Sequence, residues 1–113
     1  MIVVMGQQMT DFDGNVLKEQ IPSGETNIMG QPILKDGPPL TLRRVAMNAL
    51  VAQFQDEQGL PGDEKLIRWE LALKIKNATD PVDLFPEEVV KIKNCIAKLY
   101  GPGVSGQAWQ LLK

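Results

Sequence analysis

The side chains that most often carry enzyme chemistry are scarce in this sequence of 113 residues. It contains no histidine, so the commonest general base for a serine or cysteine nucleophile is missing. The single cysteine, Cys95, stands one helical turn before Leu99 and beside Ile96, which predicts a small core residue. We therefore expect a non-enzymatic protein without catalytic residues, cofactor or bound metal.

Two adjacent acidic pairs, Asp56-Glu57 and Glu87-Glu88, are the remaining candidates for acid–base or metal chemistry. Adjacent residues on a helix do not face each other, whereas residues three or four apart do. Glu87-Glu88 follows Pro86 at the expected start of a helix, where negative charge is favourable beside the helix dipole. The pair is therefore interpreted as a helix start and not as a catalytic site.

Composition and charge indicate an ordinary globular protein. Apolar residues make up 43% of the chain and charged residues 23%, and the net charge is −2. This acidic balance disfavours a protein built around nucleic-acid binding, although it leaves room for a local basic patch. The opening run MIVVM is too short for a signal peptide or a membrane span. We expect a soluble intracellular protein that does not contact membranes.

A change in residue types at Pro38-Pro39 divides the single domain that we expect over residues 1–113. Residues 1–38 are predicted to form a β-hairpin and loop region, and residues 39–113 a helical region. In the first region, glycine, proline and polar residues interrupt short runs of β-type residues. In the second region, apolar residues recur at helical spacing.

Asp13-Gly14 is the strongest hairpin signal in the first region, because glycine tolerates the positive φ angle of a tight turn. Residues 21–30 are predicted to form a loop and residues 31–35 a short strand. A hairpin of this size is not stable alone. We therefore expect it to pack on the helices or on a partner.

Apolar periodicity predicts four helices in the second region. The first begins at Leu42 with Thr41 as N-cap, the second starts near Asp63, and the third has Pro86 at its first position. A short fourth helix follows Gly101-Pro102. The predicted fold is α+β and mainly α: an N-terminal β-hairpin or small sheet packed on a compact bundle of about four helices.

The same periodicity predicts which helix faces form the core. The first helix has apolar residues on most sides, so we expect it to be central and buried. In the second helix, Leu66, Trp69 and Leu73 form an apolar stripe, which favours a core position for Trp69. The third helix presents one apolar row: Val89, Ile92, Ile96 and Leu99.

Five residues are candidates for contact with a partner. Ile2 and Val4 belong to the β-prone run MIVVM, which either adds a strand to a partner sheet or is an edge strand on this chain's own helices. Arg43 and Arg44, in the first turn of the first helix, either contact a phosphate or acidic partner or form a solvated helix start beside a carboxylate. Trp109 is either an interface anchor or a core residue.

Three stretches of the helical region carry a resemblance: PLTLRRVAMNALVA, DEKLIRWELALKI and VDLFPEEVVKIKNCIAKLYGPGVSGQAWQLL. Over roughly the last two-thirds of the chain they resemble a family of small proteins encoded by tailed bacteriophages and prophages. This chain departs from the family at Phe85, where a capping Thr or Ser is common, and in its MIVVM start. The resemblance implies a phage origin and supplies no catalytic residues.

The leading functional hypothesis is a non-enzymatic phage protein that acts through protein–protein contacts, in head or tail assembly or as a minor structural component of the virion. Its partner would be a phage or host protein, and a homo-oligomer is a further option. The alternative is a phage regulatory protein that binds nucleic acid or inhibits a host nucleic-acid enzyme, suggested by Arg43, Arg44 and the lysines of the third helix. Either would act in the host cytoplasm, and the first would also associate with the virion.

Overall fold

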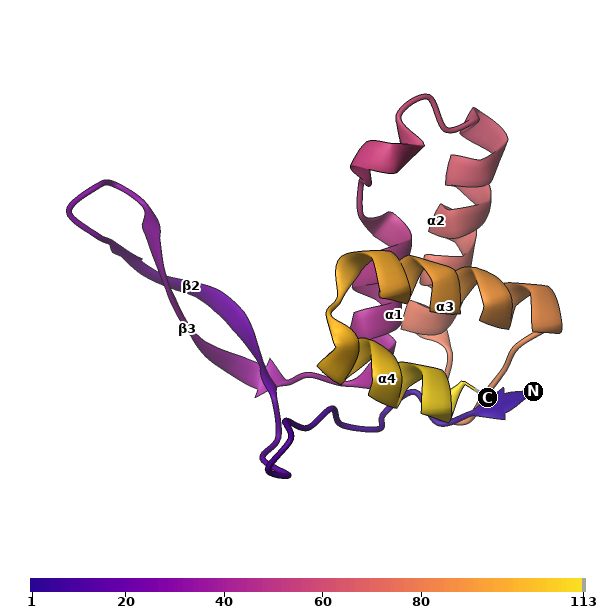
Figure 1. The fold of residues 1–113 in the computed structure, drawn as a ribbon, viewed down its shortest axis with the longest axis horizontal. Helices are drawn as coiled ribbons and strands as arrows, with labels where there is room; N and C mark the ends of the chain where they lie inside the picture. Colours follow the sequence, from indigo (N-terminus) through magenta and orange to yellow (C-terminus); the bar gives the residue numbers. More distant parts are fainter. Residues whose placement is uncertain (113) are drawn as a thin grey trace.

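The computed structural model describes residues 1–112 as a helical body from which one β-hairpin projects (Figure 1). This α+β, mainly α architecture confirms the predicted fold class. None of the helices in this range is long and apolar enough to cross a membrane. The elements are β1 Ile2–Val3, β2 Lys18–Thr26, β3 Pro32–Pro39, α1 Leu42–Val51, the 3-10 turn η1 Gln55–Glu57, α2 Gly62–Asn77, β4 Val82–Asp83, α3 Pro86–Leu99 and α4 Pro102–Leu111.

Helix α1 is the centre of the helical body and packs against both α2 and α3. It begins where the sequence predicts, because the side-chain oxygen of Thr41 accepts a hydrogen bond from the backbone N–H of Arg44 at 3.3 Å. The small residues Ala46 and Ala49 on its buried face let the neighbouring helices approach closely. The predicted central position of this helix is thereby confirmed.

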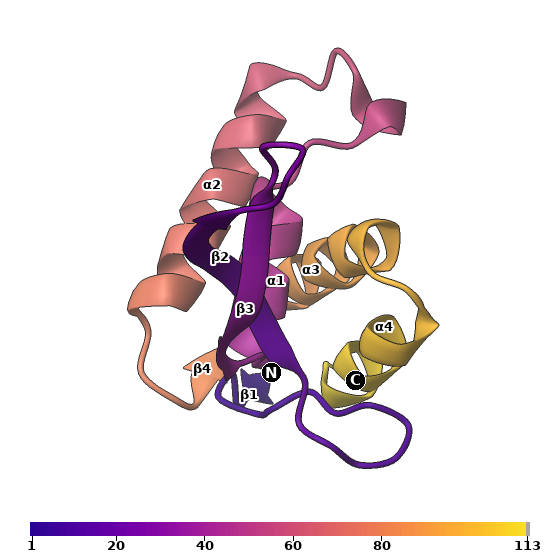
Figure 2. The same cartoon turned by 90° about the vertical axis from the view of Figure 1, so that its left-hand side faces the viewer.

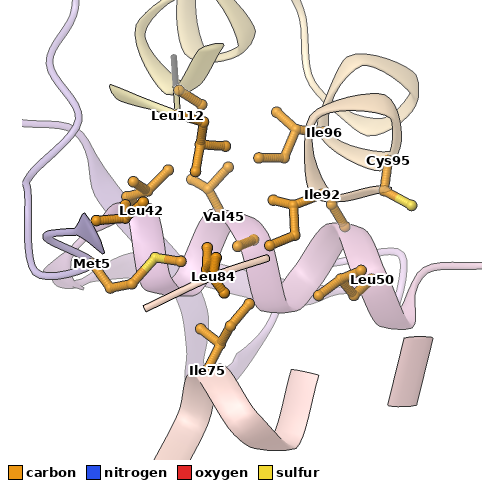
Figure 3. Close-up of a cluster of buried hydrophobic side chains, with 14 of the residues drawn as sticks. Met5, Leu42, Val45, Leu50, Ile75, Leu84, Ile92, Cys95, Ile96 and Leu112 are labelled. Atoms are coloured by element: carbon orange, nitrogen blue, oxygen red, sulfur yellow. The ribbon is translucent and has the colours of Figure 1, made fainter. Parts of the chain in front are cut away.

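The core gathers side chains from segments that are far apart in the sequence (Figure 3). Val45 of α1 lies among Ile75 of α2 and Ile92 of α3, while Met5 and Leu112 come from the two ends of the described chain. All five are at most 1% exposed. The N-terminal segment is therefore part of the interior of the protein.

Helix α2 buries a different face from the predicted one. Trp69, expected in the core, is 55% exposed, and Leu66 and Leu73 of the same stripe are exposed as well. The helix packs on α1 through Leu71 and Ile75 instead. Both stripes of α2 are apolar, so periodicity alone does not say which of them faces α1.

Helix α3 buries most of its predicted face. The row is buried as far as Ile96, but Leu99 at the last residue of the helix is 43% exposed. Cys95 is 2% exposed, which confirms its predicted place in the core. At the other end, Phe85 is an N-cap that forms no side-chain bond, and the Glu88 carboxylate accepts a hydrogen bond from the Phe85 N–H at 2.9 Å.

The run MIVVM contributes an edge strand that pairs within the chain. Strand β1 is antiparallel to β4, with Ile2 opposite Asp83 and Val3 opposite Val82. Val3 is buried, whereas its neighbours Ile2 and Val4 are exposed, as expected for alternating side chains of a strand. Of the two interpretations of this run, the structure contains the intrachain strand.

The main hairpin lies at a different place from the predicted one. Asp13-Gly14 forms a turn held by hydrogen bonds with Asp11, but the chain on either side of it pairs through the isolated bridge between Thr10 and Val16 and forms no named strands there. Residues 21–30, predicted as a loop, belong to β2 and to the turn before β3, and the strand predicted at 31–35 extends to Pro39. Proline and glycine make this segment resemble a loop, yet a solvent-exposed edge strand accepts both.

Two side chains tie the N-terminal segment to the helices. The Asp80 carboxylate accepts hydrogen bonds from the backbone N–H groups of Met5 and Gly6, each at 2.8 Å. The Gln107 side chain accepts a hydrogen bond from the Thr10 N–H at 2.9 Å and donates one to the Thr10 carbonyl. These hydrogen bonds hold the N-terminal segment against the loop after α2 and against α4.

Candidate functional site

The hairpin of β2 and β3, called the arm below, projects from the helical body into solvent (Figure 1), and in Figure 2 it points toward the viewer. Its strands pack chiefly on each other, and their residues are exposed or at most half-buried. Nine residues of extended chain in β2 correspond to a length of about 30 Å. The arm therefore does not lie on the helices and is free to contact another molecule.

The tip of the arm, residues 27–31, presents two apolar side chains on an ordered turn. Asn27 Oδ1 accepts hydrogen bonds from the backbone N–H groups of Met29 at 2.9 Å and Gln31 at 3.0 Å. Gly30 adopts the positive φ of +78° that the turn needs. Ile28 is 102% exposed and Met29 is 78% exposed. Because burying one such side chain contributes about 1.5–3 kcal/mol, covering the tip is favourable.

Both faces of the arm also carry apolar side chains. Pro22 stands opposite Leu34 on one face, and Ile21 stands opposite Lys35 on the other. Ile33 shares the face of Ile21, because side chains two residues apart point the same way in a strand. Leu34 is 54% and Ile33 40% exposed. An arm that is apolar on both faces is suited to insertion between two surfaces.

A ring of three backbone hydrogen bonds holds the base of the arm. The N–H of Met9 donates to the Leu40 carbonyl at 2.8 Å, that of Leu40 to Leu17 at 2.8 Å, and that of Leu17 to Met9 at 2.9 Å. Met9 is fully buried, so the ring joins the arm to the core. Arg44 adds an ion pair with Glu19 of β2, with Nε and Oε1 2.7 Å apart. The base of the arm is therefore anchored while its tip is free.

A second feature is a groove with both apolar and polar walls between the end of α1, η1 and the start of α2, called the α1–α2 groove below. Its volume is about 430 Å³, within the range of small binding sites. The half-exposed indole of Trp69 is part of its wall, which accounts for the surface position of this aromatic residue. Its apolar lining is formed by Leu50, Val51, Phe54, Leu60 and Trp69, and its polar lining by Gln53, Glu57, Gln58, Lys65 and Arg68.

Charged residues in and beside the groove pair with one another. The Arg68 guanidinium donates two hydrogen bonds to the Glu57 carboxylate, at 2.6 and 2.7 Å. Lys98 Nζ lies 2.9 Å from the same carboxylate, and Lys91 pairs with Glu64. Hydrogen bonds from Arg68, and secondly from Lys98, lower the pKa of Glu57 to about 2. This network holds η1 against α2 and α3 and so fixes one wall of the groove.

The substitution Glu57→Gln is expected to lower the free energy of unfolding at pH 7 and to flatten its dependence on acid. The folded-state pKa of Glu57 is about 2, below its usual 4.5, so its ionised form stabilises the fold above about pH 4.5. That contribution is lost as the pH falls from about 4.5 to about 2. Urea unfolding at a series of pH values should show wild type and variant converging at the acid end.

The control for this experiment is Glu70→Gln, which changes an exposed carboxylate in the interior of α2. It should leave the free energy of unfolding within about 0.5 kcal/mol of wild type. A constant difference between Glu57→Gln and wild type from pH 7 to about pH 2 would contradict the ion-pair explanation.

The one cysteine is not poised for reaction. Burial raises the pKa of the Cys95 thiol, so the thiol stays protonated and is a poor nucleophile. Within residues 1–112, no group of three or more histidine, cysteine, aspartate or glutamate side chains could hold a metal ion. The prominent features of the described chain are the arm and the α1–α2 groove.

The predicted contact residues do not form one site. Ile2 and Val4 are 64% and 56% exposed on the β1 side of the molecule. Arg43 is engaged within the chain, because its guanidinium lies 3.0 Å from the Asp80 carboxylate and donates to the Ala78 carbonyl at 2.9 Å. Its neighbour Arg44 pairs with Glu19 at the base of the arm.

Trp109 lies on the surface of α4 and is 40% exposed. Its indole N–H donates to the Lys93 carbonyl at 3.0 Å, and the Lys93 ammonium stands 4.7 Å from the ring centroid. This tryptophan therefore packs partly on α3 and keeps one side open to solvent.

Comparisons of the chain with protein-family models, curated proteins and solved structures found no match. The resemblance to small phage proteins therefore stays a prediction. Sequence reasoning missed the arm tip, for which one signal was present: Ile28 and Met29 stand between the turn-forming residues Asn27 and Gly30. Two apolar residues within a turn are expected to be exposed.

Proposed function

We propose that this chain is a non-enzymatic protein of a tailed phage that acts through protein–protein contacts in virion assembly. The observation that carries the proposal is the arm, with an ordered apolar tip and apolar residues on both faces. An exposed hairpin of this kind is costly to keep in water unless another protein covers it. Projecting arms that insert into a neighbour are a direct way to join subunits.

The chemistry of the chain supports a binding protein over an enzyme. The sequence has no histidine, and its one thiol is buried. The most strongly perturbed carboxylate, Glu57, is accounted for by its pairing with Arg68 and Lys98. These groups explain the stability of the groove wall without any catalytic role.

Complementation of a phage or prophage that lacks this gene tests the proposal. The tip variant, Ile28→Ser with Met29→Ser, removes both exposed apolar side chains while leaving Asn27 and Gly30 to form the turn. Loss of two hot-spot side chains is expected to weaken partner binding about hundredfold or more. The yield of infectious particles should fall accordingly, with unjoined heads or tails visible by electron microscopy.

A matched control replaces an exposed apolar residue outside the arm. Val90→Ser changes a side chain on α3 that is 57% exposed, and it should support a normal particle yield. Both variants should unfold at the wild-type temperature, because neither site contributes to the core. A normal yield from the tip variant would show that the arm is not the assembly contact.

Direct nucleic-acid binding, the alternative, has less support from the charges. Arg43, Arg44, Lys91, Lys93 and Lys98 motivated it. All except Lys93 are paired with a carboxylate of the same chain, and the Lys93 ammonium stands over the Trp109 ring. Such pairing leaves little positive potential for a phosphate backbone. A salt-dependent shift of a nucleic-acid band in the presence of this protein would revive that alternative.

A further inference from the structure

We propose that the α1–α2 groove of one copy of this chain receives the arm tip of a second copy. This inference rests on the proposed function, because both assign the arm to protein contact. It adds the identity of one partner, a second copy, and the surface on which that partner docks.

The apolar side chains of the tip match the apolar part of the groove lining. From Thr26 to Leu34 the arm carries no charged side chain, so its insertion takes no charge of the arm out of water. Ile28 and Met29 are the apolar side chains that would enter, and Leu60 and Trp69 are among the groove residues that would cover them. An aromatic wall beside an aliphatic anchor is a common arrangement at the centre of an interface.

The charges at the two sites are complementary. Glu25 is the last charged residue of β2 before the uncharged stretch, and Lys65 lines the groove. Among residues 1–112, neither takes part in an ion pair. When the tip of one copy is seated in the groove of another, Glu25 of the first copy can lie near Lys65 of the second. This attraction favours the one orientation of the tip that brings the two charges together.

The arrangement of the chain makes the contact intermolecular. The arm extends away from α1 and α2, so its tip does not reach the groove of its own copy (Figure 1). A contact between a tip and a groove joins two different surfaces and is therefore head-to-tail. Each added copy leaves one free tip and one free groove, so that association proceeds to a ring or an open chain.

The size of the contact indicates weak association. A tip of five residues in a groove of about 430 Å³ buries less than the roughly 800 Å² per partner of a stable interface. We expect dissociation constants on the order of 10⁻⁵ to 10⁻³ M. Assembly would then depend on high local concentration, as on a growing virion.

Sedimentation velocity over a concentration series tests the inference. The wild-type mass should rise with concentration, whereas the tip variant and the groove variant Trp69→Gln should each remain monomeric. An equal mixture of the two variants should form a dimer and nothing larger, because it retains one working tip and one working groove. A mixture that stays monomeric, or a groove variant that associates like wild type, would overturn the inference.

Exchanging the charges provides a second, independent measurement. Glu25→Lys and Lys65→Glu should each weaken self-association about threefold to tenfold, and the two changes in one chain should restore it. Failure of the double variant to recover would exclude this docking orientation and contradict the inference.

The outcomes separate this inference from the proposed function. A wild-type chain that stays monomeric at about 1 mM overturns the inference alone, provided that the tip variant still fails to restore infectious particles. Tip-dependent self-association together with a normal particle yield overturns the proposed function and leaves the inference standing.

Discussion

Met9→Ala is expected to lower the free energy of unfolding by about 2–5 kcal/mol. Met9 is fully buried, and its backbone belongs to the hydrogen-bond ring at the base of the arm. Truncating the side chain removes apolar contacts and leaves a cavity next to a backbone that the ring holds in place. Urea unfolding followed by circular dichroism measures the change, and the midpoint should fall at constant slope.

Met29→Ala is the matched control, because the same chemical change is made at the arm tip. Met29 is 78% exposed, so we expect its truncation to alter the free energy of unfolding by less than about 0.5 kcal/mol. Equal effects of the two substitutions would mean that the N-terminal segment is not part of the core. The pair therefore tests the division between the anchored base and the free tip of the arm.

Asp80→Ala is expected to lower the free energy of unfolding by about 2–4 kcal/mol. The carboxylate accepts hydrogen bonds from the Met5 and Gly6 N–H groups and pairs with Arg43 at 3.0 Å. Its loss leaves the part-buried Met5 N–H without an acceptor and removes the ion pair of the Arg43 guanidinium, which keeps its hydrogen bond to the Ala78 carbonyl. Thermal or urea unfolding should show the loss, with the N-terminal segment released from the loop after α2.

Two further substitutions make this prediction specific. In an Arg43→Met background, Asp80→Ala should cost less than in wild type, because the ion pair is already absent. Gly6→Ala should be destabilising in wild type, since its Cβ would lie 2.7 Å from Asp80 Oδ2. The same change should be milder in the Asp80→Ala background, where that oxygen is gone; an unchanged cost would contradict the geometry.

Local signals predicted the helices well. Thr41 caps α1, α2 begins one residue before Asp63, and Pro86 is the first residue of α3. Each signal acts within one turn: a side-chain acceptor for a free N–H, or a proline that needs no hydrogen-bond partner. Such signals do not depend on the rest of the fold, so one sequence is enough to locate them.

The candidate site was less predictable. The exposure of Trp69 depends on which of two apolar stripes of α2 faces α1, and the arm depends on the pairing of β2 with β3. The internal pairing of Arg43 depends on Asp80, which lies 37 residues further along the chain. All three depend on contacts between distant segments, and local periodicity has no information about these contacts.

The sequence by itself determined the mainly α fold class, the helix starts and the absence of histidine, because these are properties of residues or of single turns. The tertiary structure alone decided that Met5 and Met9 are core residues, that the hairpin projects as an arm, and that Trp69 lines a groove. The physical reason is burial. Whether an apolar side chain is covered depends on the total packing of the chain, and the side chains left uncovered here are those with which we propose it binds its partners.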